Sequence, residues 1–82
     1  MLRRLSDLRT GDHARVVGFV VGDTVAHRLL EMGFVRGCKV EVLHEGPFGK
    51  NPMAVKVRGS LVAIRRDEAQ RIEVEVEGGL LQ

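Results

Sequence analysis

The chain contains few aromatic residues and one cysteine. Its 82 residues include no Trp, no Tyr, three Phe and a single Cys. One cysteine excludes an internal disulfide, so folding needs no oxidising compartment. Without Trp and Tyr the chain cannot form the aromatic groove that binds proline-rich peptides. No apolar run is long enough to span a bilayer, and no signal-peptide core follows Met1. We therefore expect a cytoplasmic protein that does not insert into the membrane.

Positive and negative charges are also nearly balanced in this sequence. The formal net charge is +2, from 13 basic and 11 acidic residues. Lys56, Arg58, Arg65 and Arg66 would form a basic patch with Lys50 nearby, but the strands offer no aromatic platform for bases. The sequence thus predicts an ordinary mixed-charge surface and no nucleic-acid partner.

Signals for catalysis are missing as well. The paired carboxylates Asp67 and Glu68 lie in a predicted surface turn. The Gly49-Lys50-Asn51 segment lacks the upstream glycine and the Ser or Thr after lysine that a phosphate-binding loop needs. We predict a single domain over residues 1–82 that is not an enzyme.

One helix is indicated clearly. Asp23 is a suitable N-cap, and an apolar stripe with helical spacing follows over residues 23–32. Gly33 suits the left-handed position after the helix, and Phe34 would fold back onto Leu29, as in a Schellman motif. A short helical turn is also expected at residues 5–8 and another at 66–70.

Alternation of apolar and polar residues predicts the rest as strands. Met53, Val55 and Val57 should face inward in a hairpin that reverses at Gly59-Ser60. Residues 46–52 form the longest irregular stretch. The expected strands are 13–19, 38–45, 53–58, 61–65 and 72–76. Five short strands with one inserted helix favour a mostly β fold, a small five-stranded SH3-like barrel, because a small open sheet would expose its edges.

Three segments in this order carry a resemblance to a known family. They are LLEMGFVRGCKVEV at 29–42, PMAVKVRG at 52–59 and AIRRDEA at 63–69. With the spacing from Leu5 to Val74, they make the chain resemble the FeoA family, small cytoplasmic proteins of bacterial ferrous iron uptake. The resemblance implies an SH3-like barrel, also found at the C-terminus of DtxR-like metal-dependent repressors. One departure is the loop GPFGKNP at 46–52, which is rich in Phe and Lys for the family.

The resemblance also implies a role and a partner. It implies an accessory or regulatory protein that docks on the cytoplasmic, GTPase-containing part of the membrane transporter FeoB. The alternative is a metal-responsive SH3-like module acting on another protein partner. Linkage to a gene for a large GTPase-containing membrane protein would favour the first.

Metal binding has weak support in the residues. His27 and Glu31 are spaced i, i+4 on one helix face, but two ligands do not make a tight site. A solvated helix face with an i, i+4 contact is therefore the favoured interpretation of the pair. Cys38 and His44 would point to one face of a strand about 20 Å apart, too far to share an ion. We predict that no cofactor is required, and at most weak binding of Fe²⁺ or Zn²⁺.

Docking to a protein is the best supported role. The candidate contact residues are Phe48, Lys50, Arg65, Arg66 and Phe34, because the helix, its stop, the 47–52 loop and the end of the fourth strand should lie close together. An exposed aromatic such as Phe48 is typical of interface centres. Alternatively, Phe48 covers the end of the barrel as part of the core. A sheet edge and the apolar Leu80 and Leu81 would allow a homodimer.

Overall fold

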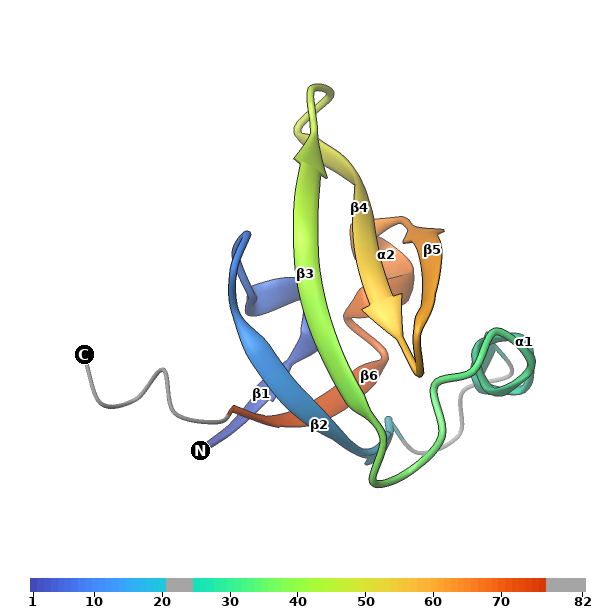
Figure 1. Cartoon of the computed structure of the whole chain (residues 1–82). Coiled ribbons are helices and arrows are strands. Elements are labelled where there is room, and N and C mark those ends of the chain that lie inside the picture. Colours follow the sequence, from blue (N-terminus) through green and yellow to red (C-terminus); the bar gives the residue numbers. More distant parts are fainter. Residues whose placement is uncertain (21–24, 77–82) are drawn as a thin grey trace.

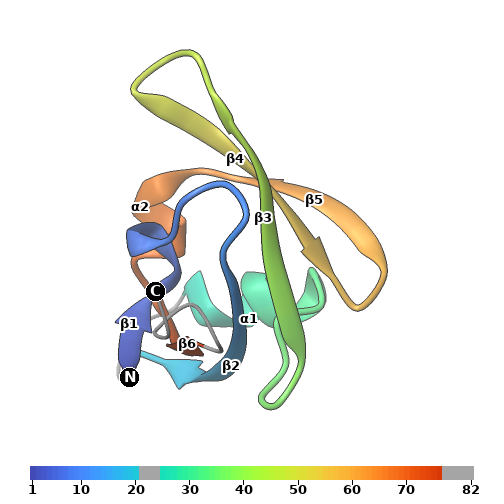
Figure 2. The same ribbon diagram turned by 60° about the vertical axis from the view of Figure 1, so that its left-hand side comes forward.

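A computed structural model describes residues 1–20 and 25–76. It contains one six-stranded antiparallel sheet, strongly curled around its core, in the order β1-β6-β2-β3-β4-β5 (Figures 1 and 2). The strands are β1 (Leu2–Arg4), β2 (His13–Phe19), β3 (Lys39–Gly46), β4 (Lys50–Val57), β5 (Ser60–Ile64) and β6 (Ile72–Val76). The helices are η1 (Leu5–Asp7), a 3-10 turn, α1 (Val25–Glu31) and α2 (Arg66–Ala69).

The predicted class is confirmed, and the five expected strands correspond to β2–β6. The sixth strand, β1, was not predicted. It pairs with β6, with Arg3 opposite Val74, and all three of its side chains are exposed. Because no residue of β1 is buried, its sequence carries no alternation that could have revealed it.

The interior of the curled sheet holds the core. Buried apolar residues come from η1, α1, α2 and strands β2–β6, including Leu5, Leu29, Met53 and Ile72. The β2–β6 register shifts between Val16 and Gly18, which marks a β-bulge in β2. No helix within the described ranges is long and apolar enough to cross a bilayer.

The β4–β5 hairpin has the predicted inner face but a different turn. Met53, Val55 and Val57 are buried as expected. Val57 pairs with Ser60, so the loop is Arg58-Gly59 and not Gly59-Ser60. Both loop residues have positive φ, 52° and 86°, as a type I′ turn requires.

The helix stop agrees with the prediction. Gly33 has φ of 109°, its N–H donates to the Leu30 carbonyl at 3.0 Å, and the Phe34 N–H donates to the Leu29 carbonyl at 3.2 Å. These two bonds define a Schellman motif and place the Phe34 ring fully in the core. Leu30, an apolar residue of the same helix, is 43% exposed. The predicted cap at Asp23 and the apolar tail at Leu80–Leu81 lie outside the described residues.

Candidate protein-docking surface

The long β3–β4 hairpin presents an aromatic side chain at its tip. Residues 46–52 are less irregular than expected, because β3 continues to Gly46 and β4 resumes at Lys50. The tip is therefore only Pro47–Gly49, and it extends away from the body of the sheet (Figure 1). Phe48 is 81% exposed there, so the alternative in which it covers the core is wrong. Lys50, with positive φ of 65°, is exposed beside it.

The neck of the hairpin is narrow because Gly46 has no side chain. A methyl group at Gly46 would overlap the backbone of Asn51 and Pro52 from the opposite strand. The Asn51 N–H also donates to the Phe48 carbonyl at 3.1 Å, which closes the tip. The exposed ring is thus carried by a tight backbone turn.

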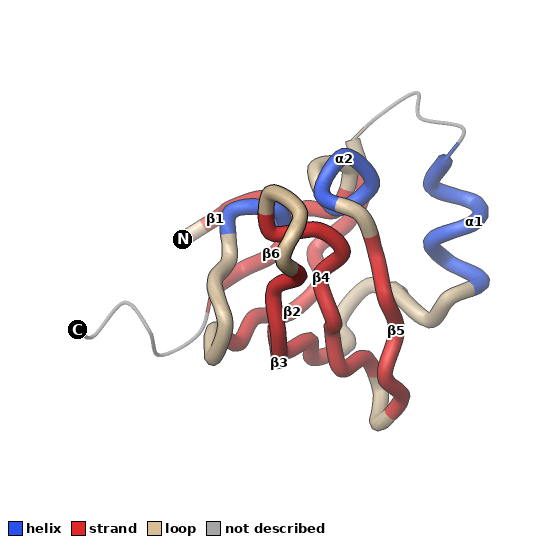
Figure 3. Tube along the Cα trace, turned by 90° about the horizontal axis from the view of Figure 1, so that it is seen from above, coloured by secondary structure: helices blue, strands red, loops and turns tan. Residues whose placement is uncertain are grey.

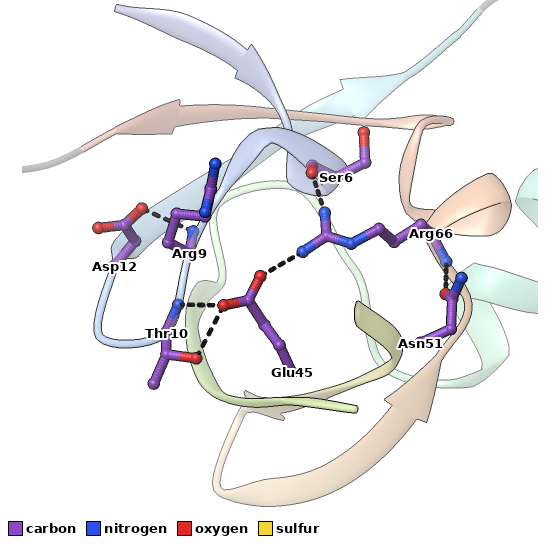
Figure 4. A network of polar contacts seen from close by, with 7 residues as sticks. All are labelled: Ser6, Arg9, Thr10, Asp12, Glu45, Asn51 and Arg66. Atoms are coloured by element: carbon purple, nitrogen blue, oxygen red, sulfur yellow. Dashed lines mark hydrogen bonds and ion pairs between the residues drawn. The ribbon is translucent and has the colours of Figure 1, made fainter. Parts of the chain in front are cut away.

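A polar cluster anchors this hairpin to the rest of the fold (Figure 4). Arg66, at the start of α2, donates through Nη2 to Oε2 of Glu45 in β3 at 2.5 Å and through Nη1 to the Ser6 carbonyl in η1. The Arg66 N–H donates to Oδ1 of Asn51 at 2.8 Å. One arginine therefore joins α2, η1 and both strands of the hairpin.

The second carboxylate oxygen of Glu45 also accepts hydrogen bonds in this cluster. Oε1 accepts from the backbone N–H of Thr10 at 3.3 Å and from its hydroxyl at 3.1 Å. Desolvation opposes the charge on Glu45, but the Thr10 hydrogen bonds and the nearby positive charges of Arg66 and Lys50 outweigh it. The pKa of Glu45 therefore lies below its ordinary value. The carboxylate is ionised at neutral pH and holds the hairpin stem to the loop after η1.

Two of the predicted contact residues are largely or completely shielded from solvent. Arg66 was predicted to contact the partner, but its side chain is only 20% exposed and is committed to this anchor. Phe34 is buried completely, so its side chain is not presented to a partner. Arg65, whose side chain is 66% exposed near Asp67, remains on the surface with Phe48 and Lys50.

The expected gathering of the helix, the 47–52 loop and the end of the fourth predicted strand is only partly present. Arg28 of α1 forms an ion pair with Glu68 of α2, and the two helices lie on the same side of the molecule (Figure 3). Glu68 also accepts from the Arg65 N–H at 3.2 Å, which caps α2. The hairpin tip, however, lies far from α1 (Figures 1 and 2). The tip and α1 are therefore separate surfaces.

The weak metal candidates form an exposed pair. Nε2 of His27 lies 3.4 Å from Oε2 of Glu31, with both side chains well exposed. Within residues 1–20 and 25–76, no group of three His, Cys, Asp or Glu side chains is arranged to hold an ion. The pair alone offers two ligands, fewer than a tight site requires.

Sequence reasoning missed the polar anchor. Ser6, Thr10, Glu45 and Asn51 are distant from Arg66 along the chain and follow no motif spacing. The sequence shows only that each of them is a polar residue in a short turn or at a strand end. Because polar residues are common in such places, this does not reveal that they meet in the folded protein.

A family model described as the FeoA domain matches residues 3–76 of this chain. A Porphyromonas gingivalis protein, named as a fusion of Fe(2+) transport protein A and the Fe(2+) transporter FeoB, is 38% identical over 73 residues. The match covers 89% of this chain but only 8% of the fusion protein.

Solved structures show the same similarity. The FeoA protein of Chlorobium tepidum is 38% identical, with a TM-score of 0.81 over 94% of this chain and 72% of that one. A Stenotrophomonas maltophilia FeoA complexed with zinc, described as a prokaryotic SH3 domain protein, is 36% identical, with a TM-score of 0.76 over 89% of each chain. A manganese-dependent transcriptional repressor is 22% identical, with a TM-score of 0.80 over 92% of this chain and 41% of the repressor; it shares the fold alone.

Proposed function

Because the chain belongs to the FeoA family, we propose that it is an accessory protein of ferrous iron transport that docks on the cytoplasmic, GTPase-containing part of a FeoB-type transporter. The fused relative from P. gingivalis carries this proposal, since one polypeptide there joins a segment like this chain to FeoB. Fusion keeps two partners at high effective concentration, which is useful only when they act together.

The docking surface is the hairpin tip with its neighbours. Phe48 supplies an exposed aromatic anchor of the kind that contributes strongly at interface centres. Lys50 and Arg65 supply positive charge for the polar rim. The anchor of Arg66 and Glu45 fixes the hairpin before binding, so less conformational entropy is lost on docking.

The proposed mechanism is conformational. The chain contacts the transporter from the cytoplasm, without bond-making of its own, and changes the stability of one transporter state relative to another. Ferrous iron is the cargo of the transporter in this account. The His27–Glu31 pair is at most a weak, secondary site for Fe²⁺ or Zn²⁺.

A ferrous iron uptake assay tests the role. Cells that lack their own FeoA-type protein should regain Fe²⁺ uptake when this chain is supplied with its cognate transporter. Phe48→Ala should impair that rescue, while Leu61→Ala, which removes another exposed apolar side chain on β5, should not. If neither the wild type nor Leu61→Ala restores Fe²⁺ uptake, although both proteins are folded and present in the cells, the chain would instead be a regulatory module that acts on another protein partner.

A further inference from the structure

A second surface feature lies on the outer face of the sheet. Because Ala14, Val40 and Val57 point into the core, the alternate residues of β2, β3 and β4 point outward. There the surface is hollowed into a pocket of about 260 Å³. It is remote from the hairpin tip, at the opposite end of β3 and β4 (Figure 1).

The pocket has an excess of positive charge. It is lined by Lys39, Lys56 and Arg58, with His13 and one carboxylate, that of Glu41. The lining therefore contains three cationic side chains and one carboxylate. Positive charge gathered in a concave surface attracts anions more strongly than the same charge dispersed over a flat surface.

The register explains why these groups converge. Glu41 of β3 lies directly between His13 of β2 and Lys56 of β4. Oε2 of Glu41 is 3.8 Å from Nε2 of His13. Among the described residues, the Lys56 and Arg58 side chains form no ion pair or hydrogen bond with the protein. Two cations at the pocket therefore retain their bonding capacity for a ligand.

The backbone of Arg58 is a second indication. Arg58 occupies the first central position of the type I′ turn with φ of 52°, where Asn or Gly is favoured. A side chain held in such a conformation costs stability, and residues of this kind cluster at ligand sites. Here the costly turn places a guanidinium, which fits phosphate oxygens with paired donors, at the rim of a basic pocket.

We propose that this pocket binds a small, multiply charged oxyanion of the phosphate class. Its volume is below the range of about 300–1,000 Å³ typical of pockets for drug-sized ligands, which favours a phosphate or diphosphate group over a whole peptide. The same group occurs in free pyrophosphate and on anionic lipid headgroups. This site does not depend on the iron-transport role, so either can fail without the other.

The test is a titration of the full ¹⁵N-labelled chain with sodium pyrophosphate, followed by NMR at constant ionic strength. Saturable shifts are expected at the Arg58 and Gly59 amides, and sodium chloride should not produce them. Arg58→Asn should weaken binding by about tenfold while keeping or raising the thermal unfolding temperature, because Asn suits the turn. Lys56→Gln should also weaken binding, and Lys50→Gln at the hairpin tip is the matched control.

Three results would overturn the proposal. One is the absence of saturation, and another is an equal loss in Lys50→Gln. The third is a chain that binds phosphatidylglycerol vesicles and not phosphatidylcholine vesicles, while its titration with pyrophosphate shows no saturation. That result would mean that this face binds a membrane surface. Competition between pyrophosphate and the anionic vesicles would support the pocket and identify the lipid as a second source of the same group.

Discussion

Nη2 of Arg66 lies 2.5 Å from Oε2 of Glu45, and this contact joins α2 to the stem of the β3–β4 hairpin. The two side chains are 20% and 17% exposed. Because they are shielded from water, removal of one partner leaves the other poorly satisfied. The exposed ring of Phe48 is thus supported by a polar contact behind it.

Replacement of Arg66 should therefore destabilise the fold. Arg66→Met removes the bonds to Glu45 and to the Ser6 carbonyl, and should lower the free energy of unfolding by about 2 kcal/mol. Arg65→Met is the matched control. Arg65 is exposed and lies 3.8 Å from Asp67, so its loss should change stability by less than about 0.5 kcal/mol. Urea unfolding of both variants measures the difference, and equal losses would contradict the anchor.

Acid should weaken the same contact. Since the pKa of Glu45 is lowered in the folded state, Glu45 contributes stability above the ordinary glutamate pKa of about 4.5, and that contribution is lost as the pH falls through the lowered folded value. The free energy of unfolding is measured from pH 7 to pH 3 for the wild type and for Glu45→Gln. Below pH 4.5 it should fall less steeply with decreasing pH in Glu45→Gln than in the wild type. If the free energy of unfolding depends on pH in the same way in both proteins, folding does not lower the pKa of Glu45 and the prediction is wrong.

The neck of the hairpin gives another test. Gly46→Ala would force the Asn51–Pro52 backbone to move, and should cost about 1–3 kcal/mol and disturb the tip. Gly18→Ala is the control, because a methyl group at the β2 bulge meets no atom within 4 Å. Thermal unfolding with amide chemical shifts of residues 46–52 measures both effects. An unchanged hairpin in Gly46→Ala would mean that the neck is not tight.

The sequence correctly predicted the structural features that depend on local residue patterns. Alternation identified Met53, Val55 and Val57 as inward residues, and Gly33 identified the helix stop, because each depends on a few neighbouring residues. The β4–β5 turn was placed one residue late because an arginine at positive φ carries no turn signal.

Features that depend on distant residues were not predictable in the same way. Phe34 was assigned to the surface although the stop that was correctly predicted folds its ring into the core. Arg66 was assigned to a partner because it stands at the end of the fourth predicted strand, while its acceptors on Ser6 and Glu45 come close only in the folded chain. For Phe48 the sequence left two possibilities, an exposed contact and a lid over the core, and only its place at the tip of the folded hairpin decides for exposure.

The docking proposal is tested by calorimetric titration of this chain into the cytoplasmic GTPase domain of its cognate FeoB-type transporter. The measurement is repeated with GDP, with a GTP analogue and without nucleotide. We predict saturable binding in at least one state with a Kd of about 10 μM or tighter, weakened about tenfold by Phe48→Ala and unchanged by Leu61→Ala. No binding in any nucleotide state by the folded wild-type chain would contradict it.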